Sequence, residues 1–275
     1  MVSIVIPTYN RESWLANAID SVKQQSFRDW ELVIVDDGSS DQSSNVVQEL
    51  TDSRITYVRV EHGGVSRARN LGVSLTRFPW VCFLDSDDQW TPAKLQRQIE
   101  TVEEFPEFRI VYTNEIWIRR GKRVNQKKKH RKFGGWIYHR CLPLCIISPS
   151  SVMLHRELLE KEGLFDESYT VCEDYELWLR ISARNPVFFL DEPLIIKFGG
   201  HDDQLSRSTW GLDVYRVGAL LKALRSGNLT PAQQIITERE LVTKAQILVS
   251  GFRKRHNLSE AEKYETLIRT WTAES

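Results

Sequence analysis

A regular alternation of short apolar runs and helix-type patterns in the first 105 residues constrains the fold most. The candidate strands are residues 2–6, 32–35, 55–60 and 81–84, which are rich in apolar and β-branched side chains. Such runs are typical of strands buried in a parallel sheet. Apolar residues at helical spacing lie between strands, for example Leu15, Ala18, Ile19 and Val22. Together they predict an α/β fold with a mostly parallel mixed sheet flanked by helices.

Two further helices in this half have recognisable start signals. Ser66 is a candidate cap for a helix that ends near Leu75. Thr91 followed by Pro92 matches a helix start, because Pro is favoured at the first helical position. The apolar face of that second helix would carry Leu95, Ile99 and Val102.

Composition argues against several classes of protein. The 275 residues are 41% hydrophobic and 27% charged, as in a folded soluble chain, and the net charge of zero gives no reason to expect a nucleic-acid partner. No apolar run approaches the roughly 20 residues of a membrane span, and the N-terminus lacks the basic region of a signal peptide. We therefore expect a cytoplasmic protein. Its cysteines are expected to be buried free thiols: Cys82, Cys141, Cys145 and Cys172.

Polar residues follow three of the predicted strands at the point where each strand ends. These loops are residues 7–10, 36–40 and 85–88. Because ligands of α/β proteins bind beyond the carboxyl ends of the strands, we expect the three loops to lie at one edge of the sheet. Carboxylates, hydroxyls and an aromatic ring would converge there.

The third of these loops raises a question of charge. Asp85, Asp87 and Asp88 directly follow a buried strand, where their carboxylates repel one another. A divalent cation would offset that repulsion, since Mg²⁺ and Mn²⁺ take carboxylate oxygens and often share them with substrate phosphates. A D-x-D pattern is common by chance, so an ordinary acidic turn is the alternative.

The second half of the chain is organised differently. Residues 119–132 hold a dense run of Lys and Arg, for which two interpretations stay open: a solvated mobile loop, or a contact with an anion or a membrane surface. Residues 147–154 suggest another strand. Glu173 and Asp174 open a predicted helix that carries Tyr175.

Beyond about residue 210 the sequence indicates only helices. Apolar residues recur at helical spacing from Leu212 to Leu224, and capping-box patterns at residues 230–233 and 259–262 begin two more helices. We expect this tail to pack on the preceding domain or to form a dimer contact rather than to bind the substrate.

Five segments in order along residues 2–206 resemble family 2 inverting glycosyltransferases, which have the GT-A fold. The segments are residues 3–11 (SIVIPTYNR), 31–41 (ELVIVDDGSSD), 64–72 (GVSRARNLG), 83–88 (FLDSDD) and 163–180, which ends in EDYELWLR. The resemblance implies a GT-A-like glycosyltransferase domain over residues 1–206 and a helical extension over 207–275. Residues 1–115 would form the nucleotide-sugar-binding half and residues 116–206 the acceptor-binding half.

The resemblance also implies roles for residues that bind the nucleotide base. Pro7, Thr8 and Tyr9 would line the base pocket, with the ring of Tyr9 as a stacking face. Packing in the core is the alternative for Tyr9. Asp36 would accept a hydrogen bond from the base, uracil in many members of the family. A turn closed by the side chain of Asp37 is the alternative for that loop.

A second set of implied roles concerns the diphosphate and its cation. Arg67 would lie near the diphosphate. Asp85 would touch the ribose or the coordination shell of Mn²⁺ or Mg²⁺, and Asp87 would bind that cation directly. His201, which follows two glycines, would ligate the cation or contact a phosphate, with a surface histidine in a turn as the alternative.

The implied reaction moves a sugar from a nucleotide-diphosphate sugar, with UDP-sugars favoured, to an acceptor hydroxyl. Asp174 would remove the proton of that hydroxyl as general base, and Glu173 would contact the acceptor. Helix capping is the alternative for this pair, because acids at a helix N-terminus interact favourably with the helix dipole. The competing functions are a sugar-phosphate nucleotidyltransferase, whose Gly-rich loop after the first strand is missing here, and a catalytically inactive nucleotide-sugar-binding protein.

The partners expected on these grounds are a nucleotide-sugar donor and a sugar or lipid-linked acceptor. Residues 119–132 would supply a peripheral contact with the inner face of the membrane, and the tail would supply a homodimer contact. The sequence leaves the donor sugar, the acceptor and the linkage open.

Overall fold

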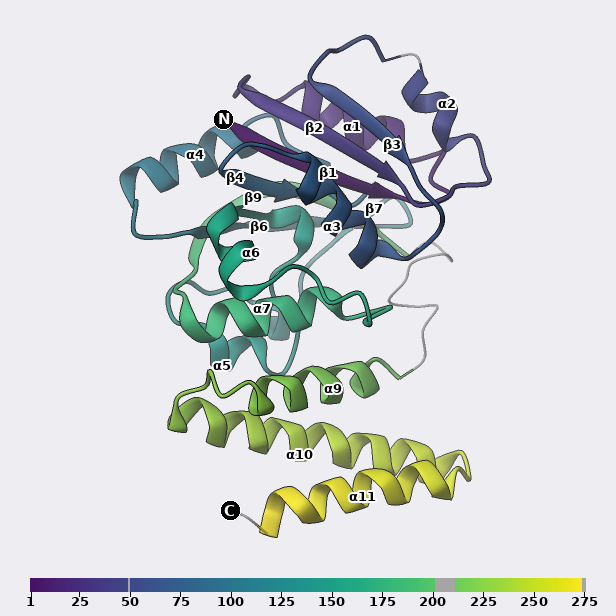
Figure 1. Cartoon of the computed structure of the whole chain (residues 1–275), viewed down its shortest axis with the longest axis vertical. Coiled ribbons are helices and arrows are strands. Elements are labelled where there is room, and N and C mark those ends of the chain that lie inside the picture. The colour runs from purple at the N-terminus through teal and green to yellow at the C-terminus, as the bar shows by residue number, and fades with distance from the viewer. Residues whose placement is uncertain (49, 201–210, 274–275) are drawn as a thin grey trace.

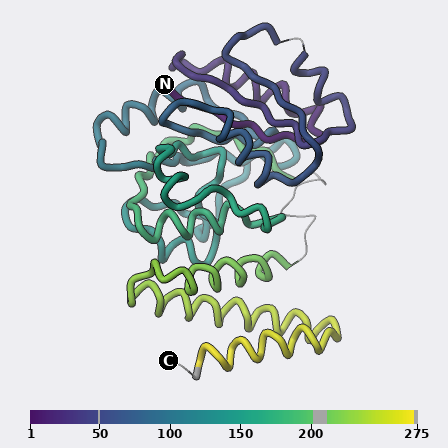
Figure 2. Tube along the Cα trace, viewed as in Figure 1, coloured from purple at the N-terminus to yellow at the C-terminus, as the bar shows by residue number. Residues whose placement is uncertain are grey.

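The computed structural model describes residues 1–48, 50–200 and 211–273. A nine-stranded sheet and its flanking helices occupy one end of the molecule, and a stack of three helices occupies the other (Figure 1). The N-terminus lies at the sheet, whereas the last described helix is the outermost of the stack (Figure 2). The predicted α/β architecture with a helical C-terminal part is thereby confirmed.

The four strands predicted in the first half form the parallel part of the sheet. They are β1 (Val2–Thr8), β2 (Trp30–Asp36), β3 (Ile55–Arg59) and β4 (Trp80–Phe83). Their order is β3-β2-β1-β4, so the first strand is central. Every residue of β1 and β2 is buried, which explains why both sequences are almost continuously apolar.

The remaining strands make the sheet mixed. They are β5 (Asp88–Trp90), β6 (Ile110–Arg119), β7 (Lys122–Val124), β8 (Val152–His155) and β9 (Phe188–Gly199). β8 pairs antiparallel with both β4 and β6, whereas β6 runs parallel to β9. Of these five strands, only β8 overlaps a predicted strand, at residues 147–154. The acidic loop (residues 85–88) leads directly into the short strand β5, which pairs antiparallel with β9.

Helices cover the parallel strands closely. They are α1 (Leu15–Lys23), α2 (Ser43–Gln48), α3 (Val65–Leu75) and α4 (Lys94–Glu104). A Cβ atom on Gly72 of α3 would lie 2.3 Å from Cγ1 of Val5, so only glycine permits this contact between α3 and β1. That close approach holds α3 directly against β1.

Two of the predicted helix starts are wrong. α3 begins after Gly64, so Ser66 lies inside the helix and its hydroxyl donates to the Tyr169 carbonyl instead. α4 begins at Lys94, because the backbone N–H of Thr91 is bonded to Leu194 and keeps that residue extended beyond β5. Helix ends follow such tertiary contacts, which a local pattern does not contain.

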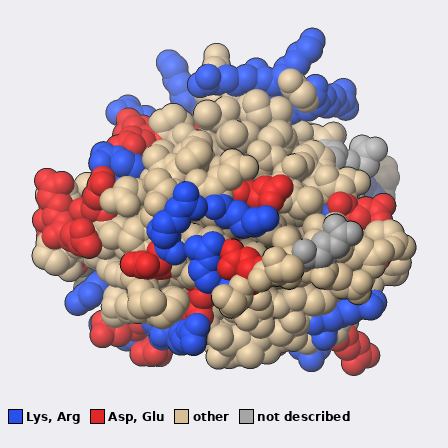
Figure 3. Space-filling view, turned by 90° about the horizontal axis from the view of Figure 1, so that it is seen from above, with Lys and Arg blue, Asp and Glu red and all other residues tan. Residues whose placement is uncertain are grey.

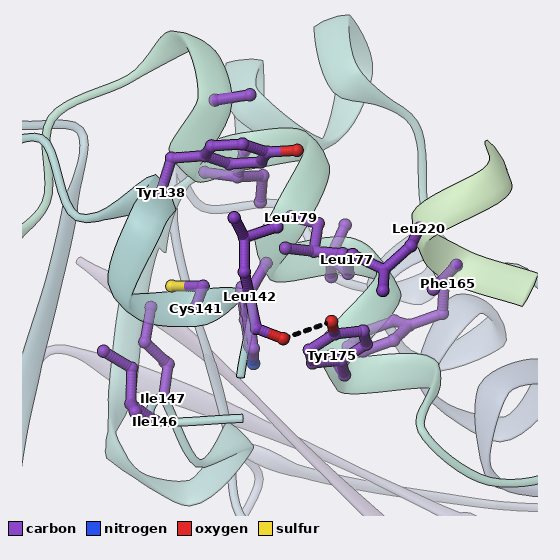
Figure 4. Packing of buried hydrophobic residues seen from close by; sticks show 14 of the residues in the cluster. Tyr138, Cys141, Leu142, Ile146, Ile147, Phe165, Tyr175, Leu177, Leu179 and Leu220 are labelled. Atoms are coloured by element: carbon purple, nitrogen blue, oxygen red, sulfur yellow. Dashed lines mark hydrogen bonds between the residues drawn. The ribbon is translucent and has the colours of Figure 1, made fainter. Parts of the chain in front are cut away.

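In the second half of the chain, α5 (Tyr138–Cys141) and α6 (Arg156–Glu162) pack around α7 (Glu173–Arg184), which leads away from the edge of the sheet. Single 3₁₀ turns lie at Lys128–His130 and Pro149–Ser151. Figure 4 shows Tyr175 of α7 among apolar side chains, with its hydroxyl directed at the carbonyl of Leu142; the two oxygens are 2.6 Å apart. This bond fixes the first turn of α7.

The basic stretch, residues 119–132, is only partly a loop. Arg119 pairs with Lys122 in a β6–β7 hairpin, and the cations of that hairpin are exposed. Lys132 instead has a buried side chain whose ammonium donates to Glu115 at 2.9 Å and to the Ile146 carbonyl. The interpretation of the whole run as a solvated loop is therefore wrong at Lys132. On the face drawn in Figure 3, Lys and Arg gather along one margin without Asp or Glu among them.

The C-terminal tail packs on the preceding domain, which was one of the two expected arrangements. It consists of α9 (Leu212–Arg225), α10 (Pro231–Lys254) and α11 (Leu258–Ala273). α9 packs on α7, and α10 packs on α9 and α5, where the hydroxyls of Thr237 and Tyr138 are 2.8 Å apart. Among the described residues, no helix has the length and apolarity to cross a membrane.

Only one of the two predicted capping boxes forms. Thr230 and Gln233 cap α10 reciprocally, as predicted. The box at residues 259–262 is wrong: α11 begins one residue earlier, and the carboxamide of Asn257 accepts the N–H of Glu260. All four cysteines are free, but Cys145 and Cys172 are only half-buried.

Candidate active site

The loops that follow β1 and β2 are joined to each other by hydrogen bonds. The carboxamide oxygen of Asn10 accepts the N–H of Ser40 at 2.8 Å, and the hydroxyl of Ser39 accepts the N–H of Asn10 at 2.9 Å. The N–H of Asp37 also bonds to the carbonyl of Thr8. β4 lies on the other side of β1, so the acidic loop joins them at the predicted edge.

The three residues expected at the base pocket lie at this edge in different settings. Pro7 and Thr8 are buried at the end of β1, and the Thr8 hydroxyl has no hydrogen-bond partner among the described residues. The Tyr9 side chain is 43% exposed and its ring stacks on His62, with the centroids 4.3 Å apart. Core packing, the alternative for Tyr9, does not occur.

Asp36 and Asp37 organise the edge in ways that the sequence did not reveal. Asp36 is fully buried and accepts the Ser39 N–H at 2.8 Å and the Tyr57 hydroxyl at 2.6 Å. The turn expected from Asp37 is therefore made by Asp36. Burial, and next the hydrogen bond to Asp36, raise the pKa of Tyr57, which keeps its hydroxyl protonated as a donor.

Asp37 instead reaches the loop before α3. Its two carboxylate oxygens accept the backbone N–H groups of Gly63 and Gly64, each at 2.8 Å. His62 approaches the same carboxylate at 2.8 Å. These contacts fix the start of α3 relative to the end of β2. Arg67, the expected diphosphate contact, is exposed in the first turns of α3.

The repulsion among the aspartates of the acidic loop is offset first by cations of the chain itself. Arg69, on α3, donates from one nitrogen to Asp85 at 2.7 Å and from another to Glu173 at 2.6 Å. Its side chain is only 4% exposed. Arg69 was not among the predicted site residues, although it lies within the 64–72 segment. Its position on the buried face of a helix, three residues before Gly72, was the available signal.

A second cation of the chain lies beside Asp88. Lys197 on β9 is 3.8 Å from the Asp88 carboxylate, which is buried and also accepts the Ser150 hydroxyl at 2.7 Å. That hydroxyl in turn accepts the N–H of Asp85. Burial raises the pKa of Asp88 even though Lys197 opposes the shift, whereas Arg69 and Lys197 outweigh burial and lower the pKa of Asp85. Asp88 thus holds the loop and is not oriented outward.

Two carboxylates of the loop fit a divalent cation. Asp85 is bonded to Arg69 through Oδ1, and Asp87 is half-buried at the rim. Among the described residues no three His, Cys, Asp or Glu side chains gather as a metal site. Two carboxylates are, however, the number that Mg²⁺ commonly takes beside substrate phosphates. His201, the third expected ligand, lies outside the described residues.

The two predicted catalytic acids begin α7. Glu173 is bound by Arg69, and burial together with the charge of Asp174 keeps its pKa above the usual range despite that arginine. Asp174 accepts the N–H of Tyr175 on Oδ1 at 2.7 Å and the thiol of Cys145 on Oδ2 at 3.3 Å. Neither Arg69 nor Cys145 was among the predicted site residues, because both contacts join distant parts of the chain.

Comparison with known proteins agrees with this fold. Residues 3–163 match glycosyl transferase family 2, more than half of the chain. The chain therefore belongs to glycosyl transferase family 2, as its motifs predicted. This membership favours sugar transfer over the nucleotidyltransferase alternative.

Individual relatives cover different shares of their own length. An uncharacterised glycosyltransferase of Rickettsia felis is 32% identical over 70% of this chain, and the match spans 32% of that protein. WfgD of Escherichia coli, a UDP-Glc:α-D-GlcNAc-diphosphoundecaprenol β-1,3-glucosyltransferase, is 34% identical over 68% of this chain and 72% of its own length.

Solved structures share the GT-A fold at low identity. TarS of S. aureus, residues 1–349 in complex with UDP-GlcNAc, has a TM-score of 0.68 at 17% identity, over 98% of this chain and 91% of that one. The mannosyltransferase PcManGT of Pyrobaculum calidifontis, in complex with GDP-Man and Mn²⁺, has a TM-score of 0.63 at 18% identity, over 98% and 84%.

Proposed function

We propose that this protein is an inverting glycosyltransferase that moves a sugar from a nucleotide-diphosphate sugar, with UDP-sugars favoured, to an acceptor hydroxyl. One observation carries the proposal. Two pairs of acids, Asp85 with Asp87 and Glu173 with Asp174, come from distant segments to one sheet edge, and Arg69 connects them. One pair suits the diphosphate and its cation, and the other suits proton removal.

On the donor side, the residues at the ends of β1 and β2 would receive the nucleotide. The exposed ring of Tyr9 offers a stacking face, and the buried Thr8 hydroxyl, which has no partner in the described residues, offers a hydrogen bond. Asp85 and Asp87 would hold Mn²⁺ or Mg²⁺ against the diphosphate. When bound, that cation supplies Lewis-acid stabilisation of the charge on the leaving diphosphate.

On the acceptor side, Asp174 is the proposed general base. Its carboxylate is fixed through the Tyr175 N–H and the Cys145 thiol. An acceptor hydroxyl would give its proton to Asp174 as it attacks the anomeric carbon from the face opposite the diphosphate. Attack from that face inverts the anomeric configuration.

We further propose a lipid-linked acceptor and a peripheral contact with the membrane. WfgD acts on a diphosphoundecaprenol-linked acceptor, as its name states. The exposed cations of the basic stretch are Arg119, Arg120, Lys122, Arg123, Lys127, Lys128, Lys129 and Arg131. Arg119 pairs with Gly199, two residues beyond Lys197 on β9, so the hairpin begins about 7 Å along the strand from the acidic loop. Clusters of this kind bind anionic lipid surfaces. The homodimer expected from the tail stays a prediction.

The test is a donor screen with a structural readout and a chemical one. The protein would be incubated with Mn²⁺ and a panel of UDP-, GDP- and dTDP-sugars, and thermal shift and slow donor hydrolysis would be measured. A cation-dependent shift and hydrolysis with one UDP-sugar are expected. A shift without hydrolysis or transfer to any acceptor would favour the inactive binding protein, and no response to any donor would contradict the proposal.

A further inference from the structure

Arg69 stands out because the proposed chemistry does not call for a buried arginine between its two halves. Its guanidinium carbon lies 5.1 Å from the centre of the Phe165 ring, and its side chain is 4% exposed. Two of its nitrogens are bonded to two different carboxylates, while its Nε is buried with no hydrogen-bond partner among the described residues. Burying a charge is costly unless it is paired, so this position is strongly determined.

The helix that carries Arg69 is tied to every part of the site. Asp37 fixes its start through the two preceding glycines. Further along, the carboxamide of Asn70 donates to the Phe165 carbonyl at 2.9 Å and accepts the Phe165 N–H at 3.0 Å. The Ser66 hydroxyl reaches the Tyr169 carbonyl. α3 therefore holds the segment that leads into α7 at several points, and Arg69 is the last of them before the catalytic acids.

We infer that Arg69 is a positioning residue that couples the donor side of the site to the general base. Its bond to Asp85 engages a carboxylate proposed to face the cation, and its bond to Glu173 engages the residue next to Asp174. The two bonds set the spacing between the donor and the base. This inference rests on the proposed function and gives Glu173 a different role from the acceptor contact that the sequence suggested.

The geometry requires a forked cation at this position. Each carboxylate is bonded to a separate terminal nitrogen of the guanidinium, at 2.6 and 2.7 Å. A lysine at position 69 would bring one ammonium in place of the planar fork and would not hold both acids in the same geometry. A shift of about 1 Å in the base relative to the donor is enough to slow transfer by about 100-fold.

Coupling also runs from the donor to the base. A cation and diphosphate that bind Asp85 change the contact of that carboxylate with Arg69, and Arg69 passes the change to Glu173. By linkage, a change at Glu173 alters the affinity for the donor only by the factor by which the donor alters the Glu173 contact, and this factor is expected to be below about 3-fold because Asp85 keeps its own bond to Arg69. Arg69 variants are therefore expected to affect both donor binding and turnover, whereas Glu173 variants affect mainly turnover.

The experiment compares two substitutions at Glu173. Glu173→Gln keeps an oxygen that accepts from Arg69, and Glu173→Leu removes it. We expect Glu173→Gln to keep turnover within about 10-fold of wild type and Glu173→Leu to lose about 100-fold, with donor affinity in Mn²⁺ changed less than about 3-fold. Calorimetry would give the affinity and single-turnover assays the rate. Equal losses in the two variants would assign Glu173 to the acceptor and overturn the inference.

A double variant separates positioning from folding. Glu173→Leu alone leaves Arg69 with one partner, whereas Arg69→Met with Glu173→Leu replaces the pair by apolar groups, which is often neutral for stability. Asp85 then loses its arginine, but its side chain is 27% exposed and Lys197 remains as a cation near it. The double variant should melt within a few degrees of wild type, yet transfer sugar about 100-fold more slowly and bind donor less tightly. A folded double variant with turnover within 3-fold of wild type would overturn the inference.

A matched control lies on α7, the helix that begins with Glu173. Glu176 is buried as Glu173 is, but its carboxylate pairs with Arg180 and Lys222, away from the donor. Glu176→Leu should lower the melting temperature and leave turnover per folded molecule unchanged. Failure of the proposed function would look different, because wild-type protein would then show neither cation-dependent donor binding nor turnover.

Discussion

The helical tail and the acidic edge of the sheet are held together in opposite ways. In the tail, Thr230 and Gln233 cap α10 across three positions, and apolar spacing along α10 determines which face is buried. At the edge, Arg69 contacts residues 16 and 104 positions away, and Asp88 meets the N–H of Phe198 across 110 positions. Local sequence specifies the tail, whereas only the completed fold assembles the edge.

This difference predicts which substitutions change chemistry and which change only stability. Contacts at the edge orient acids that would meet the donor or the acceptor. Contacts of the tail with the domain are made mainly to α5 and α7. The predictions below probe the edge first and the tail last, in order of decreasing effect.

The largest effect is expected at Asp174. Asp174→Asn keeps the shape of the side chain and removes the proton acceptor, so transfer should fall by about 10²–10⁴-fold. Donor affinity should change little, because the lost interaction belongs to the transition state. Single-turnover rates and donor titrations of the purified variant would measure both quantities.

Glu173→Gln is the control for that measurement and should lower the transfer rate far less than Asp174→Asn does. A variant Asp174→Asn that transfers sugar at nearly the wild-type rate, beside an inactive Glu173→Gln, would move the base to Glu173. Two active variants would leave helix capping as the explanation for both acids.

The next effect concerns the buried cation of the basic stretch. Lys132→Met leaves the Glu115 carboxylate, 3% exposed, without its nearest cation. Removing one partner of a buried pair costs about 3–5 kcal/mol, so thermal unfolding should shift down by at least about 6 °C. Lys129→Met, in the exposed part of the same run, is the control and should change stability by less than about 0.5 kcal/mol. Equal shifts would mean that Lys132 is solvated.

A smaller effect is expected at the cap of α10. Thr230→Ala removes the side chain that accepts the Gln233 N–H and should cost about 1 kcal/mol, or about 2–4 °C in melting temperature. Thr230→Ser restores the cap. Turnover should be the same in wild type, Thr230→Ala and Thr230→Ser. A loss of rate in Thr230→Ala would show that contacts in the tail also affect the chemistry at the edge.

The smallest effect depends on pH and lies where the tail meets the domain. Burial raises the pKa of Asp166, but hydrogen bonds from Lys222 and Ser168 outweigh it and lower this pKa to about 2. A carboxyl whose folded pKa is lowered stabilises the protein above its ordinary pKa, and that stability is lost as the pH falls from about 4 to 2. The loss should be below about 1 kcal/mol, since the pair is partly exposed and screened by solvent.

The difference in melting temperature between wild type and Asp166→Asn, measured from pH 5 to pH 2, isolates this contribution. It should be present at pH 5 and vanish towards pH 2. A difference that grows as the pH falls would mean that Lys222 does not stabilise the ionised carboxylate.

The sequence was sufficient to predict the four parallel strands of the first half, the edge of the sheet where their loops meet, and the family, because each of these leaves a local pattern. Buried parallel strands are continuous apolar runs, and the polar loops after them must meet at one edge. It did not reveal Arg69 or Lys197, since one cation on a helix and one on a strand do not indicate which acids they will face. It misplaced the start of α4 for the same reason: Thr91 is held by Leu194, more than 100 residues away.

The acidic loop at residues 85–88 shows the same limit of sequence-based prediction. The sequence predicts that the carboxylates of Asp85, Asp87 and Asp88 repel one another and that a divalent cation offsets this repulsion. The structure supplies part of the answer from within, through Arg69 beside Asp85 and Lys197 beside Asp88. The proposed divalent cation would add to these internal cations at Asp85 and Asp87.

Calorimetric titration of the preferred UDP-sugar in Mn²⁺ and in EDTA, for wild type and Asp87→Asn, tests this account most directly. Wild type should bind the donor in Mn²⁺ and lose at least about 10-fold in affinity in EDTA, because the proposed cation would be held by Asp87 and would stabilise the charge of the diphosphate. Asp87→Asn should bind weakly in both conditions, with little difference between them. Equal binding by wild type in Mn²⁺ and EDTA, or a variant with full Mn²⁺-dependent affinity, would contradict the account.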